Sequence, residues 1–93
     1  MVEKLDWKGK YSLSLIENMS IKDIERLTDC GQPQAISIRN DSIRYCEKNN
    51  IYRFGTKVPT EVVLLIIGKS REYYYQRMLD EKKLEQDLKD DSD

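Results

Sequence analysis

The longest apolar run in this highly charged chain extends from Val62 to Ile67 and contains six consecutive aliphatic residues. Such a run is expected in the core, with the rest of the chain folded around it; if exposed, it would be a dimer seam or an aggregation hazard. Four of the six residues are β-branched, which favours a strand. The flanks favour a helix instead, because the Pro-Thr-Glu sequence at 59–61 is a helix-start pattern and Gly68 is a helix stop. We therefore predict a short buried helix.

The length of the chain, 93 residues, is that of one small domain with a thin core. It has no stretch of roughly 18 apolar residues, so we expect no membrane span. Its first residues mix acids with apolar side chains, unlike a secretory signal. We therefore expect a cytoplasmic protein in which Cys30 and Cys46 are reduced thiols that line the core.

Several catalytic chemistries have no residues to support them. Histidine is absent, which removes the commonest general base and metal ligand. Two cysteines cannot provide the four ligands of a structural zinc site. Gly68-Lys69-Ser70 resembles the end of a phosphate-binding loop, but the first glycine of that motif would fall at position 63, which is Val63. We expect neither an enzyme nor a cofactor.

The first half of the chain contains one well-marked helix. Residues 1–10 are polar and predict an N-terminal arm, while the alternation at 11–16 suits a short strand or the start of a helix. Ser20 and Asp23 form a capping-box pattern, and the helix that they begin ends before Gly31.

The segment 33–58 stays open between strand and helix. Asn40 or Asp41 can cap a helix there, which Asn49-Asn50 would close. Residues 51–58 suit a small hairpin or a simple connector. Within this segment Arg39, Arg44, Lys48 and Arg53 form either a second basic patch or a solvated face.

The last predicted helix begins at Arg71, with Ser70 as its cap, and continues into an acidic tail at 81–93. On this helix one residue of Tyr73-Tyr74-Tyr75 is expected in the core and the others at the surface. Residues 80–93 carry a net charge of −4 and residues 1–79 a net charge of +3. The folded part is therefore mildly basic, and the tail is either a solvated helix end or a mimic of phosphate.

Residues 60–79 have the plan of a helix-turn-helix, in which Gly68 sets the turn and the second helix enters the major groove of DNA. A weaker repeat of the plan begins at Ser20, with Gly31 in the position of Gly68. Segment 58–74, VPTEVVLLIIGKSREYY, resembles the helix-turn-helix of small DNA-binding proteins of phages and mobile elements, including excisionase-like proteins. The residues that this resemblance places against DNA are Lys69, Ser70, Arg71, Glu72, Tyr75 and Gln76.

The expected fold is mainly α, a small helical bundle with a helix-turn-helix at 60–79 within a domain at 11–80, and with a short β-hairpin as an option. The expected function is sequence-dependent or architectural binding of double-stranded DNA by a regulator of a phage or mobile element. We expect no association with a membrane, and a homodimer is an option. The alternative is a protein–protein interaction module that binds and inhibits a host enzyme or nucleic-acid machine.

Overall fold

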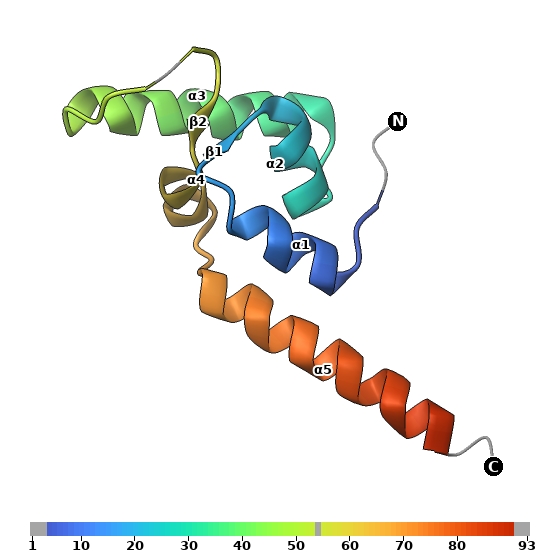
Figure 1. Cartoon of the computed structure of the whole chain (residues 1–93). Helices are drawn as coiled ribbons and strands as arrows, with labels where there is room; N and C mark the ends of the chain where they lie inside the picture. Colours follow the sequence, from blue (N-terminus) through green and yellow to red (C-terminus); the bar gives the residue numbers. More distant parts are fainter. Residues whose placement is uncertain (1–3, 54, 91–93) are drawn as a thin grey trace.

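The computed structural model describes residues 4–53 and 55–90, with side chains up to residue 86. Within this part the chain is mainly helical, as predicted, with one small antiparallel sheet (Figure 1). The elements in chain order are α1 (Trp7–Ser14), β1 (Asn18–Met19), α2 (Ile21–Thr28), α3 (Gln32–Lys48), β2 (Val58–Pro59), α4 (Thr60–Ile67) and α5 (Arg71–Asp90).

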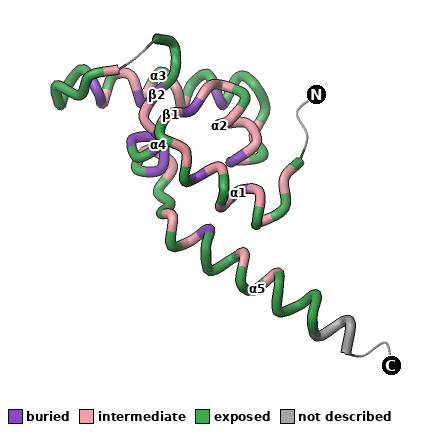
Figure 2. The backbone as a smooth tube through the Cα atoms, in the orientation of Figure 1, coloured by how far each residue is buried: buried purple, intermediate pink, exposed green. Residues whose placement is uncertain are grey.

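The core lies between α2, α3, α4 and the small sheet. Its fully buried members include Met19 from β1, Ile24 from α2 and Val63 from α4. The predicted burial of the aliphatic run is confirmed for Val62 to Leu64, whereas Leu65 is 57% exposed on the outer side of α4. Figure 2 shows that burial is concentrated in the body and that most of α5 is exposed.

The N-terminal arm predicted at 1–10 is wrong in part, because α1 already begins at Trp7. Asp6 caps this helix, since its carboxylate accepts a hydrogen bond of 2.8 Å from the backbone N–H of Gly9. The helix runs to Ser14, so the alternation at 11–16 belongs mainly to a helix and not to a strand. The sequence did not indicate this helix start, because the first turn contains Gly9 and glycine disfavours a helix.

Helix α3 settles most of the segment that the sequence left open. It begins at Gln32, with Gly31 as its N-cap and Pro33 in its first turn, so Asn40 and Asp41 lie within the helix and do not cap it. The expected end is confirmed, because Asn50 adopts the left-handed conformation just beyond Asn49.

Of the two options for residues 51–58, a hairpin or a simple connector, the described residues fit the connector, and β2 at its end pairs with the distant strand β1. Met19 of β1 faces Val58 of β2 in antiparallel register, and the N–H of Thr60 donates to the carbonyl of Glu17 at 3.0 Å. The sheet therefore joins the chain before α2 to the chain before α4, and it holds α2 and α3 against α4.

Candidate nucleic-acid interface

The turn between α4 and α5 has the local geometry that the sequence predicts. Gly68 adopts the left-handed conformation, with φ 72° and ψ 32°, and the Ser70 hydroxyl accepts a hydrogen bond of 3.1 Å from the N–H of Tyr73. The two helices then pack against different partners. Helix α4 lies against α3, while α5 lies along α1 and extends away from the body (Figure 1).

The two basic residues among the six predicted DNA contacts have their charged groups engaged within the protein. The guanidinium of Arg71 donates from Nε to the carbonyl of Ser14 at 2.7 Å and from Nη1 to Glu61 at 3.4 Å. It therefore joins α5 to the end of α1 and to α4. The ammonium of Lys69 lies 4.4 Å from the centre of the Tyr73 ring.

The six predicted contacts do not lie on one surface. Ser70 is used as a cap, and Tyr75 lies with its ring centre 5.3 Å from that of Tyr11 on the α1 side of α5. Glu72 and Gln76 are exposed, and the Gln76 amide donates to Asp80 at 3.2 Å. The structure thus places Arg71 and Tyr75 on the α1 side of α5, and Glu72 and Gln76 on its solvent side.

Helices α2 and α3 form a second helix pair, and these two helices do pack on each other. Their connection, residues 29–31, is three residues long, and Asp29 turns the chain in the left-handed conformation with φ 56°. Ala35 is fully buried on the inner side of α3, where its small side chain permits close helix packing. This arrangement matches a helix-turn-helix more closely than α4 and α5 do.

The outer face of α3 carries polar side chains at helical spacing. Ser37, Asn40 and Arg44 follow one another at intervals of three and four residues, so they lie on one face, and all three are exposed. Arg44 makes only a weak pair with Asp41, at 3.4 Å, and its side chain is 75% exposed. Asparagine and arginine are the side chains that most often bind adenine and guanine edges.

The positive charge of the folded part is concentrated beside this face. Residues 39–57 contain five basic and two acidic residues, a net charge of +3, while the rest of residues 1–79 is neutral. The loop after α3 is held close to the helix, because Arg39 Nε donates to the carbonyl of Thr56 at 3.0 Å. The sequence had pointed to this basic patch, but without the start of α3 it could not place the patch on a helix face.

The three adjacent tyrosines divide as predicted. Tyr74 is 3% exposed, Tyr73 is half-buried, and Tyr75 is 43% exposed. Burial, with a smaller contribution from Tyr73, raises the pKa of Tyr74 to about 12. A hydrogen bond from Arg77 is the main cause that lowers the pKa of Tyr73.

Tyr74 should therefore make the stability depend on pH in the alkaline range. Its contribution is complete below about pH 10, and it is lost as the pH rises towards 12, because the unfolded chain ionises first. We expect the free energy of unfolding to fall by about 1 kcal/mol more between pH 9 and pH 11 in the wild type than in Tyr74→Phe. Urea unfolding of both proteins at pH 9 and pH 11 measures this difference. An equal fall in the free energy of unfolding in the two proteins would contradict the prediction.

Two other kinds of site are not found in the described part of the chain. None of its helices combines the length and the apolar character needed to cross a bilayer. None of its acidic and cysteine side chains gather in groups of three or more that could bind a metal ion. Cys30 and Cys46 are free thiols, and only Cys46 is fully buried.

Comparison of the chain with protein-family models, with curated proteins and with solved structures finds no match.

Proposed function

We propose that this protein binds double-stranded DNA, with α3 as the helix that enters the major groove. The observation that supports the proposal most directly is the coincidence of three features on α3. This helix packs on α2 through a three-residue turn, it presents Ser37, Asn40 and Arg44 on one outer face, and it carries the charge excess of the folded part nearby. These are the features by which a helix-turn-helix positions and recognises DNA.

Phosphate contacts would come from the two ends of α3. No side chain caps the N-terminus of this helix, so backbone N–H groups of its first turn are available to an anion. Lys48 and Lys57 are exposed at the other end and on the adjacent loop. A cytoplasmic regulatory or architectural role accords with this mode of binding. The six residues between positions 69 and 76 that the resemblance placed against DNA would then lie outside the contact with DNA.

The test compares isosteric charge changes on the two candidate helices. Asn40→Asp on α3 and Gln76→Glu on α5 each add one negative charge at an exposed position. We expect Asn40→Asp to weaken binding to a random-sequence duplex by about ten- to hundredfold and Gln76→Glu to change it by less than about twofold. Binding is followed by fluorescence anisotropy at about 50 and 200 mM salt, because phosphate contacts give a steep salt dependence.

A second pair removes one positive charge from each helix. Arg44→Gln is expected to lower both the affinity and the salt slope, while the matched variant Arg77→Gln on α5 should leave both nearly unchanged. The reverse outcome, with the α5 variants defective, would restore 69–76 as the DNA-binding surface. If the wild type fails to bind DNA at the lower salt concentration, the proposal is wrong.

The exposed half of α5 supports one other candidate function, the binding of a host protein. Beyond the part covered by α1, this helix presents Leu79 and Leu84, which are 38% and 61% exposed, among mainly acidic residues. Apolar side chains surrounded by acids suit a partner with a basic rim. Truncation after Leu79 separates the two candidates, because it should abolish protein binding and retain DNA binding.

A further inference from the structure

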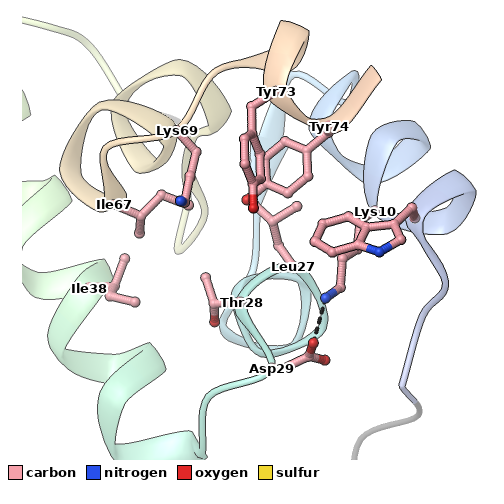
Figure 3. A pocket seen from close by; sticks show the side chains of 10 residues that line it. Lys10, Leu27, Thr28, Asp29, Ile38, Ile67, Lys69, Tyr73 and Tyr74 are labelled. Carbon is pink, nitrogen blue, oxygen red and sulfur yellow. Dashed lines mark hydrogen bonds and ion pairs between the residues drawn. The ribbon is translucent and has the colours of Figure 1, made fainter. Parts of the chain in front are cut away.

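A cavity of about 420 Å³ lies between α1, α2, α3, the end of α4 and the start of α5 (Figure 3). Its size is within the usual range for small-molecule sites. The rings of Trp7, Tyr73 and Tyr74 line one part of it, and the aliphatic side chains of Leu27, Ile38 and Ile67 line another. Figure 3 shows Ile38 and Ile67 on the side opposite Lys10. A ligand for this cavity therefore needs an apolar body, and the aromatic wall favours a flat ring.

The polar groups of the cavity are few. Lys10 forms an ion pair with Asp29, which neutralises both charges. Lys69 remains, with its ammonium over the Tyr73 ring and with no carboxylate within ion-pair distance among the side chains that the structure describes. The pocket charge is therefore about +1, and the charge that would complement it is one anionic group.

Backbone carbonyls at the ends of α2 and α4, beside the cavity, already accept hydrogen bonds from the protein. They do not call for a hydrogen-bond donor on the ligand. Thr28 donates its hydroxyl to the carbonyl of Ile24 at 2.7 Å at the end of α2. The backbone N–H of Lys69 donates to the carbonyl of Leu64 at 3.0 Å at the end of α4. A cationic ligand is also disfavoured, because Lys10 and Arg77 already lie over the Trp7 ring and Lys69 over Tyr73.

We propose that this cavity binds a small aromatic carboxylate, with its ring against Tyr74 and the aliphatic side chains and its carboxylate paired with Lys69. The site does not depend on DNA binding, because it shares no residue with the outer face of α3. It would make this chain a receptor for a small molecule in addition to its proposed function.

The test uses the full chain with cinnamate and its uncharged analogue cinnamamide. Trp7 is the single tryptophan of the chain, so its indole N–H gives one readily assigned NMR signal from a residue that lines the cavity. We expect cinnamate to shift this signal and to bind more tightly than cinnamamide in calorimetry. Lys69→Gln should weaken cinnamate about tenfold and leave cinnamamide unchanged, as for the loss of one charge-assisted contact.

Two further variants complete the experiment. Lys22→Gln removes an exposed lysine that does not line the cavity and should bind cinnamate like the wild type. Ile67→Phe fills the cavity from its aliphatic wall and should block both compounds, with circular dichroism as the check on folding. The proposal is overturned if the Trp7 signal does not move at about 10 mM cinnamate, which would saturate even a millimolar site. It is also overturned if both compounds bind equally or if Lys69→Gln binds cinnamate like the wild type.

Discussion

Replacement of Ile24 by alanine is expected to lower the free energy of unfolding by about 2–5 kcal/mol. Ile24 is fully buried on the inner face of α2, within the cluster that includes Leu27 and Val63. The change removes apolar contacts and leaves a cavity that a close-packed core fills only in part. A domain of this size has a total stability of about 5–15 kcal/mol, so the loss is a large fraction of the whole.

Urea unfolding followed by circular dichroism measures this effect at equilibrium. Leu84→Ala is the matched control, because it also shortens an aliphatic side chain but at a position that is 61% exposed. We expect the control to change the free energy of unfolding by less than about 0.5 kcal/mol. A loss below about 1 kcal/mol in Ile24→Ala would mean that the core is not centred on α2.

Local signals in the sequence predicted the elements whose ends are set by their own residues. The capping box of Ser20 and Asp23 is present at α2, with both of its hydrogen bonds. Gly68 adopts the left-handed conformation that ends α4, and Ser70 caps α5. Each of these features depends on residues within a few positions of one another, which is why the sequence alone revealed them.

The features that the sequence missed depend on contacts between distant segments or on competing local signals. The pairing of Met19 with Val58 joins positions that are far apart in the sequence, so no local pattern indicates it. In α3, Asn40 and Asp41 have side chains that often cap helices, but here they lie in a helix that packing on α2 extends. Tertiary packing therefore prevailed over local preference.

The candidate site shows the same division. The basic residues at 39–57 were visible in the sequence, but the side chains that share the outer face of α3 became clear only once the helix was known to begin at Gln32. The turn at Gly68 was also visible, yet nothing near it revealed that α5 would lie along α1. That choice depends on aromatic contacts between Trp7 and residues more than sixty positions away, Tyr73 and Tyr74.

The joint between α1 and α5 leads to the second large prediction. Tyr74 is the buried residue in the part of α5 whose side chains the structure describes, and its ring centre lies 6.4 Å from that of Trp7 and 5.2 Å from that of Tyr73. Tyr74→Ala should therefore lower the free energy of unfolding by about 3–5 kcal/mol, as for the removal of a buried aromatic ring. Tyr75→Ala, the control one position away and 43% exposed, should cost less than about 1 kcal/mol.

Trp7 fluorescence distinguishes the loss of this joint from a general loss of stability. If Tyr74 holds α5 against α1, the folded Tyr74→Ala protein should show a red-shifted Trp7 emission before any urea is added, while Tyr75→Ala should keep the wild-type spectrum. Ile24→Ala, which weakens the core on α2, should also keep that spectrum while it remains folded. A wild-type emission in folded Tyr74→Ala would show that the remaining contacts, those of Arg71 and the other aromatic pairs between α1 and α5, hold α5 in place without the Tyr74 ring.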